Sequence, residues 1–123
     1  MIYIIDDDKM MADCIAREVS SVYDGVIKIF TNGIEAITAL DDGVPELIFL
    51  DILLDGPDGF SFLNEICSYS DTGKIPVVVV SSLNLSDVEL TDYGVVKVLD
   101  KSTMTPLDIK RCIRMYCKGK NEY

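Results

Sequence analysis

Four short, largely apolar runs occur along the chain, and each is followed at once by acidic, hydroxyl or amine side chains. An unbroken apolar stretch as short as 47–50 is typical of a strand buried on both faces of a parallel sheet. Open α/β sheets bind their ligands at the carboxyl ends of such strands, which all lie on one edge. The residues that follow these runs are therefore expected to meet at that edge. The four runs are 1–5, 47–50, 76–80 and 95–99.

The side chains at this expected edge are chemically complementary. Asp6 and Asp7 follow the first run, Asp51 follows the second, Ser81 ends the third and Lys101 comes shortly after the fourth. Carboxylates are ligands for hard cations and can act as nucleophiles, whereas a hydroxyl and an ammonium group can bind anionic oxygens. Acids, a hydroxyl and an amine are thus expected to lie together at one edge of the sheet, as a candidate functional site.

A further short strand is predicted at 26–30, and helical stretches are predicted after residues 8, 32, 58, 82 and 105. The clearest start signal is Thr105, with Pro106 at the first helical position and an acid, Asp108, three residues after the cap. The stretch between 83 and 94 has the weakest helical pattern. Right-handed crossovers then predict one α/β domain, a five-stranded parallel sheet with helices on both faces.

Length and charge limit what a chain of this kind can do. Its 123 residues are enough for one domain, predicted over 1–118, with 119–123 as a tail or the start of a linker. The net charge of -10 argues against direct nucleic-acid binding. No apolar run approaches the length of a membrane span and no basic leader is present, so a cytoplasmic location is expected.

Histidine and cysteine usage add two more constraints. The chain has no histidine, which excludes histidine-based triads, histidine metal sites and a phosphohistidine on this chain. The four cysteines show no C-x-x-C spacing and all lie in helix-like segments, which favours reduced, buried thiols over disulfides or a metal site. They are Cys14, Cys67, Cys112 and Cys117.

In this order along the chain, the strand-end residues resemble the receiver domain of bacterial two-component response regulators. The resemblance extends over essentially the whole chain and includes the Asp58-Gly59 pair in the loop after Asp51. It implies a flavodoxin-like, doubly wound parallel sheet with strand order 2-1-3-4-5. It also implies a signalling switch rather than an enzyme, in which Asp51 accepts a phosphoryl group from a histidine kinase or a histidine phosphotransfer protein.

The resemblance also assigns roles to the surrounding residues. Mg²⁺ would be bound by Asp6, Asp7, Asp51 and the backbone carbonyl of Leu53. The Ser81 hydroxyl and the Lys101 ammonium group would bind phosphoryl oxygens, and Lys101 would pair with Asp51 beforehand.

Three positions depart from the family pattern. Asp55 stands where the family usually has a proline after the phosphoacceptor, and Pro57 comes two residues later. Ser102 follows Lys101 in place of a proline that normally forms a cis bond. Because a cis bond before a non-proline residue costs about 2.5–4 kcal/mol, a trans bond is expected here. Val98 replaces the usual aromatic switch residue, which puts the usual coupling to an output surface in doubt.

Neighbouring polar residues have simpler interpretations. Asp8 and Asp58 are expected to cap helices, and Ser82 is expected to be a small packed residue beside the site. Two alternatives also stay open: a haloacid-dehalogenase-type phosphatase with Asp6 as nucleophile and Asp8 as acid, and a receiver-like binding module that is never phosphorylated. The phosphatase alternative leaves Asp51 and its loop unexplained.

The last helical stretch combines an apolar stripe with basic residues, on a domain that is otherwise acidic. Lys110, Arg111 and Arg114 are predicted to face an acidic output partner or a second copy of the chain, together with the fourth helical stretch and the fifth strand. The alternative is a solvated helix face with cations near its carboxyl end.

Overall fold

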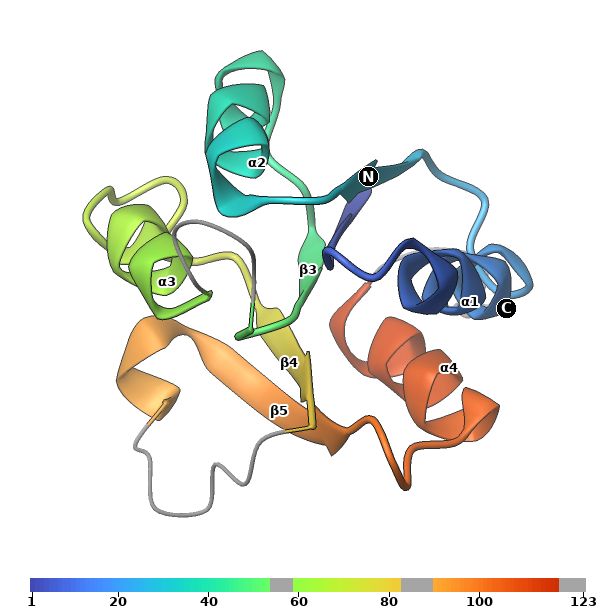
Figure 1. Cartoon of the computed structure of the whole chain (residues 1–123). Helices are drawn as coiled ribbons and strands as arrows, with labels where there is room; N and C mark the ends of the chain where they lie inside the picture. Colours follow the sequence, from blue (N-terminus) through green and yellow to red (C-terminus); the bar gives the residue numbers. More distant parts are fainter. Residues whose placement is uncertain (54–58, 83–89, 118–123) are drawn as a thin grey trace.

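The structure is a computed structural model that describes residues 1–53, 59–82 and 90–117. Its centre is one five-stranded parallel sheet with strand order β2-β1-β3-β4-β5 (Figure 1), as predicted. The strand limits agree with the apolar runs to within a residue. They are β1 (Ile2–Ile5), β2 (Ile27–Phe30), β3 (Leu47–Leu50), β4 (Val77–Ser81) and β5 (Val95–Asp100).

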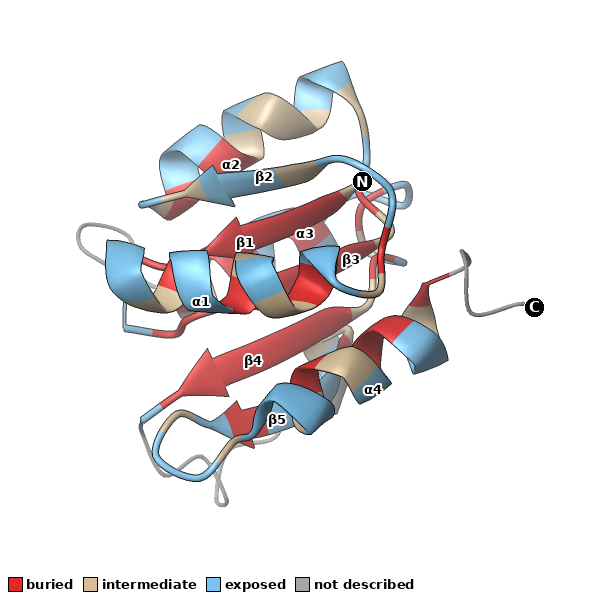
Figure 2. Cartoon of the chain, turned by 90° about the vertical axis from the view of Figure 1, so that its right-hand side faces the viewer, coloured by how far each residue is buried: buried red, intermediate tan, exposed pale blue. Residues whose placement is uncertain are grey.

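Helices cover both faces of the sheet, as Figure 1 shows for the whole chain and Figure 2 for the side that faces α1 and α4. The helices are α1 (Lys9–Ser20), α2 (Gly33–Ala39), α3 (Gly59–Cys67) and α4 (Pro106–Tyr116), with short 3-10 turns η1 (Leu40–Asp42) and η2 (Thr91–Tyr93). Residues 83–89 of the predicted fourth helical stretch lie outside the described residues, as do 54–58 and 118–123.

Three helix starts form by the capping expected from the sequence. The Asp8 carboxylate accepts from the amides of Met10 and Met11 at the start of α1. Asn32 accepts from the Glu35 amide at the start of α2. At the start of α4, Thr105 and Asp108 form a reciprocal capping box. Each cap satisfies amides that have no partner within the helix.

Alternate strand residues pack against opposite helix layers. On β1, Ile2 and Ile4 join the core under α1 and α4, whereas Tyr3 and Ile5 join the core under α2 and α3. β3 and β4 alternate in the same way. This two-sided burial explains why the central strands have no polar residue until their last position.

Several burial predictions for side chains in α2 and α3 were wrong. The helical spacing of Ile34, Ile37 and Leu40 predicts that they form the inner face of α2, but Ile34 is exposed, and Gly33 and Ala36 are buried in its place. In α3 the buried aromatic is Phe62, whereas Phe60 is half-buried. The cysteines also divide: Cys112 and Cys117 are buried, but Cys14 and Cys67 are exposed.

A polar cluster closes the amino end of the sheet. The Met1 ammonium group donates to the Tyr23 hydroxyl and to a Glu46 carboxylate oxygen, and the Tyr23 hydroxyl donates to that same oxygen. Burial and the bond to Glu46 raise the pKa of Tyr23, so the phenol stays neutral. Burial first, and the nearby Glu46 second, raise the pKa of the Cys117 thiol to about 12. We call Met1, Tyr23, Glu46 and Cys117 the amino-edge cluster.

In the part of the chain that the structure describes, no helix is both long and apolar enough to span a membrane.

Candidate functional site

Sheet hydrogen bonds continue to the carboxyl ends of the strands and fix the backbone of the predicted site. The Asp51 amide donates to the Ile5 carbonyl at 2.9 Å, which places Asp51 beside the end of β1. The Lys101 amide donates to the Ser81 carbonyl at 3.1 Å, which places Lys101 beside the end of β4. Residues separated by up to about a hundred positions in sequence are thus held by one hydrogen-bond ladder.

The three predicted acidic residues lie together at this edge. One carboxylate oxygen from each of Asp6, Asp7 and Asp51 lies within 4.8 Å of the others. Asp6 and Asp51 are buried, so solvent screens their charges poorly. Such a group of carboxylates repels itself unless a cation balances it.

Lys101 supplies that cation to two of the acids. Its ammonium nitrogen lies 3.0 Å from Asp6 Oδ2 and 3.0 Å from Asp51 Oδ2. Burial lowers the pKa of Lys101, but its bonds to the two carboxylates outweigh burial, and the pKa is raised overall. The predicted pairing with Asp51 is thus present, and pairing with Asp6 is an addition that the sequence did not indicate. We call Asp6, Asp7, Asp51 and Lys101 the carboxyl-edge cluster.

Asp6 is the least satisfied member of this cluster. Its Oδ1 accepts the Asp8 amide at 2.9 Å. Its Oδ2 is buried and accepts no aligned hydrogen bond from the described residues, so its contact with Lys101 is an ion pair without good hydrogen-bond geometry. Burial raises the pKa of Asp6, Asp51 raises it further, and the Asp8 amide and Lys101 oppose the rise. Additional positive charge at this oxygen would be favourable.

This donor set fits Mg²⁺. Mg²⁺ prefers oxygen ligands in an octahedron with metal–oxygen distances of about 2.0–2.1 Å, and it usually keeps several waters. Opposite ligands of one ion are therefore about 4 Å apart, so three carboxylates already within 4.8 Å need little adjustment to share one. The excess of acids over the one lysine also favours a divalent cation.

Two other predicted site residues border the cluster. Ser81 is buried at the end of β4, next to the backbone of Lys101. The Leu53 amide donates to Asp51 Oδ1 at 3.1 Å, while its side chain is exposed to solvent. Asp51 thus has one oxygen held by a backbone amide and the other by Lys101.

The start of α3 packs directly on the backbone of Asp51 and Ile52. The Gly59 amide donates to the Ile52 carbonyl at 2.9 Å. A Cβ at Gly59 would lie 2.6 Å from Ile52 Cα and 2.7 Å from the Asp51 carbonyl oxygen. Glycine is needed here because no side chain fits between the helix and the strand end.

Lys101 lies in a turn that begins at Asp100, and the turn holds the backbone of Lys101 in place. This turn was not predicted from the sequence. Asp100 Oδ1 accepts from the Ser102 amide at 2.8 Å and from the Ser102 hydroxyl at 2.6 Å. The Asp100 carbonyl accepts from the amides of Thr103 and Met104. All peptide bonds of the described residues are trans, which confirms the expectation for Lys101–Ser102. The Asp-x-Ser spacing is itself a sequence signal for a turn of this type.

The simpler interpretations have mixed outcomes. Asp8 caps α1, as predicted, so its carboxylate is engaged away from the role of acid that the phosphatase alternative requires. Ser82 is exposed, so the prediction of a packed residue was wrong. Val98 is exposed on β5. Asp55, Pro57 and Asp58 lie outside the described residues.

Comparisons with known sequences agree with this geometry. The family profile of the response regulator receiver domain matches residues 2–113. A protein-glutamate methylesterase/protein-glutamine glutaminase from Rhodospirillum rubrum is 35% identical over 91 residues, which cover 73% of this chain and 24% of that protein. Histidine kinase 5 from Arabidopsis thaliana is 28% identical over 91 residues, covering 72% of this chain and 9% of the kinase. The chain thus spans a quarter or less of these relatives.

Solved structures share the same fold. The receiver domain of NtrX from Brucella abortus superposes with a TM-score of 0.81 at 23% identity, covering 94% of this chain and 97% of that one. The regulator TrrA from Thermotoga maritima, in complex with Mg²⁺-BeF, superposes with a TM-score of 0.78 at 19% identity, covering 94% and 96%. Given the profile match over nearly its whole length, the chain belongs to the family of response regulator receiver domains.

Proposed function

We propose that Asp51 is the phosphoacceptor of this receiver domain and that the carboxyl-edge cluster binds the Mg²⁺ on which its phosphorylation depends. Phosphorylation and Mg²⁺ binding are typical of the family. The observation that best supports the assignment is the position of Asp51, which shares one ammonium group with Asp6 and lies among three acids at the strand ends. Asp6, Asp7, Asp51 and the Leu53 carbonyl would hold the ion.

The chain's own residues account for the rest of the transfer. A carboxylate oxygen of Asp51 forms a bond to phosphorus while the phosphorus–nitrogen bond of the donor's phosphohistidine breaks, and the released imidazole takes a proton from solvent. Lys101 gives up its contact with Asp51 for one with a phosphoryl oxygen, and the Ser81 hydroxyl donates to another. When bound, Mg²⁺ supplies positive charge to the phosphoryl oxygens.

The phosphoryl donor in this proposal is a histidine kinase or a histidine phosphotransfer protein, since the chain has no histidine of its own. Such a relay places the domain in the cytoplasm. The phosphorylated domain would act on a downstream output domain or protein rather than on nucleic acid directly, in keeping with its net charge of -10.

The outer face of α4 is the proposed output surface. Arg111 and Arg114 are exposed there, close to the exposed Leu107 and Met115. A face with both cations and apolar side chains suits an acidic partner or a second copy of the domain. Replacing both arginines with glutamate should reduce partner binding or phosphorylation-dependent dimerisation, measured by sedimentation. If neither changes, the face is only solvated.

The phosphoacceptor assignment is tested by intact-mass analysis after incubation with a small acyl-phosphate donor and Mg²⁺. Wild type should gain one phosphoryl group and Asp51→Asn none, whereas Asp13→Asn, which removes an exposed acid of α1, should behave as wild type. Peptide mapping should locate the acyl phosphate on Asp51. Equal labelling of Asp51→Asn, or an acyl phosphate on Asp6, would overturn the assignment. No labelling of wild type would favour a module that is never phosphorylated.

A further inference from the structure

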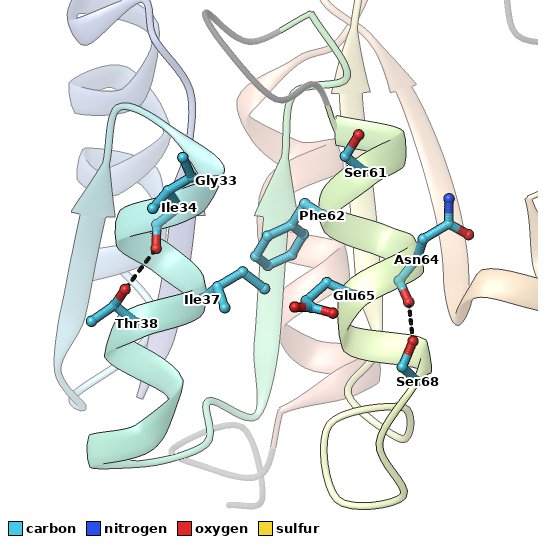
Figure 3. Close-up of a pocket in the computed structure, with 9 residues that line it drawn as sticks. All are labelled: Gly33, Ile34, Ile37, Thr38, Ser61, Phe62, Asn64, Glu65 and Ser68. Atoms are coloured by element: carbon cyan, nitrogen blue, oxygen red, sulfur yellow. Dashed lines mark hydrogen bonds between the residues drawn. The ribbon is translucent and has the colours of Figure 1, made fainter.

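A surface groove runs between α2 and α3, on the face of the domain covered by these two helices (Figure 3). Its first part has a volume of about 540 Å³ and lies between the residues from Gly33 to Thr38 and those from Ser61 to Ser68. A second hollow of about 380 Å³ shares Ile37, Thr38 and Glu65 with the first and extends to Tyr69 and Thr72. We call this continuous depression the α2/α3 groove.

The floor of the α2/α3 groove is apolar, although threonine and serine residues are among those that line it. Figure 3 shows Ile37 and Phe62 pointing toward each other across it. The hydroxyl of Thr38 donates to the Ile34 carbonyl at 3.0 Å, and that of Ser68 donates to the Asn64 carbonyl at 2.8 Å. Both hydroxyl hydrogens are thus used within their own helices, so an apolar ligand surface would leave these two donors with their partners.

Two exposed apolar side chains lie next to this floor and are not covered by the rest of the domain. Ile34 is 60% exposed and lines the first part of the groove. Tyr69 is 57% exposed and lines the second part. Exposed apolar side chains grouped around an apolar depression are characteristic of a protein-binding site.

The charged residues of the groove all have the same sign. Glu65 borders both hollows, and Asp41 and Asp71 border the second. Neither lysine nor arginine is among the described residues that line it. An acidic rim around an apolar floor is complementary to a ligand that is apolar in the middle and cationic at its sides.

From this complementarity we propose that the α2/α3 groove binds an amphipathic helix with basic flanks, contributed by a partner protein. A helix that lies between two others buries one apolar face, with side chains at positions i, i+3, i+4 and i+7 as anchors. The nine residues of α3 extend for about 13 Å, which matches a ligand helix of two to three turns. None of the lining residues belongs to the carboxyl-edge cluster, so the proposal does not depend on phosphorylation.

The test uses a fluorescein-labelled helical peptide of about fourteen residues, with leucine at the anchor spacing and lysine elsewhere, and a control peptide with glutamate in place of lysine. Fluorescence anisotropy with the whole chain should show saturable binding of the lysine peptide alone. Glu65→Lys and Ile34→Ala should each weaken it by roughly tenfold. The matched surface variants Asp13→Lys and Val26→Ala should bind as wild type does, since Val26 is 59% exposed and lies outside the groove.

These controls separate a specific site from attraction to a domain of net charge -10. Equal weakening by Asp13→Lys and Glu65→Lys, or no binding of the lysine peptide, would overturn the proposal. Amide chemical shifts should change along α2 and α3 when the peptide is added, and changes concentrated on α1 or α4 would also overturn it. Self-association of the wild type that Glu65→Lys abolishes would make a second copy the occupant in place of a partner.

Discussion

β1 and β3 have a polar cluster at each of their ends, and the two clusters differ in charge balance. At the amino edge, the Met1 ammonium group faces the Glu46 carboxylate across the neutral Tyr23 hydroxyl. At the carboxyl edge, three carboxylates lie close together and the one ammonium group of Lys101 pairs with two of them, Asp6 and Asp51. The first cluster is close to neutral, whereas the second has an excess of two negative charges.

The two clusters show the difference between polar groups that stabilise the fold and polar groups that are arranged to bind a ligand. A buried polar group costs little when its hydrogen bonds are complete, and the amino-edge cluster approaches that state. A buried charge that lacks opposite charge or hydrogen-bond partners is unfavourable unless a bound ligand supplies them. Asp6 is in this position, with a raised pKa and one oxygen that lacks an aligned hydrogen bond from the described residues. We therefore expect Mg²⁺ to stabilise the carboxyl-edge cluster and to leave the amino-edge cluster unchanged.

The largest effect should come from removing the one cation of the carboxyl-edge cluster. Lys101→Met leaves the acids uncompensated and should lower the free energy of unfolding without Mg²⁺ by about 3 kcal/mol. Added Mg²⁺ should restore much of this loss, because it replaces the missing charge. Urea unfolding with and without Mg²⁺ measures both effects. Lys97→Met, which removes an exposed cation of β5, is the control, and equal losses in the two variants would contradict the charge argument.

Breaking the amino-edge cluster should have a smaller effect that does not depend on Mg²⁺. Tyr23→Phe removes the hydroxyl between Met1 and Glu46 and should lower the free energy of unfolding by about 1–1.5 kcal/mol. Tyr69→Phe, at an exposed tyrosine, should change it by less than about 0.5 kcal/mol. A loss for Tyr23→Phe that varies with Mg²⁺ would show that the two edges are coupled.

Alkaline pH should weaken the amino edge through Cys117. Burial and the nearby Glu46 raise the pKa of this thiol from its ordinary value of 9.0 to about 12, so the folded state keeps the proton more tightly. The resulting stability is complete below pH 9 and is lost as the pH rises from 9 toward 12. Between about pH 8 and pH 10, wild type should lose about 1 kcal/mol more than Cys117→Ala. Cys14→Ala, at an exposed cysteine, should follow the wild-type slope, and identical slopes for all three would refute the assignment.

The smallest effect concerns how Lys101 is held. Asp100→Ala removes the side-chain bonds to Ser102 and should slow phosphorylation by a small acyl-phosphate donor roughly threefold, because the ammonium group is less well positioned. Asp100→Asn keeps an acceptor oxygen and should retain most of the rate. Both variants should unfold at nearly the wild-type urea concentration. A rate for Asp100→Asn as low as that for Asp100→Ala would indicate that charge, not the turn, matters.

The strands and the site could be predicted because both depend on short stretches of sequence: an apolar run and the polar residues that follow it. Short apolar runs bounded by turn residues favour buried strands, and a parallel sheet brings their polar ends to one edge, which is why Asp6, Asp51 and Lys101 could be grouped. Periodicity alone did not show that Ile34 is exposed, because the burial of a seven-residue helix depends on how it sits on the sheet.

The amino-edge cluster could not be predicted from the sequence. Tyr23 and Glu46 are 23 residues apart, and neither lies in a recognisable motif. Their contact exists because the Glu46 amide bonds to the Met1 carbonyl, which brings the start of β3 beside the start of β1. The second contact of Lys101, with Asp6, has the same origin in tertiary structure. It depends on how far a flexible side chain extends across two strand ends.

The carboxyl edge lacks positive charge and the amino edge does not, and unfolding with and without Mg²⁺ measures this difference. At a Mg²⁺ concentration about ten times its Kd, wild type should gain about 1.4 kcal/mol in the free energy of unfolding. Tyr23→Phe should gain the same amount from its lower starting value. Asp7→Asn, which removes one proposed ligand, should lose most of the gain. No gain in wild type, or an undiminished gain in Asp7→Asn, would contradict the account.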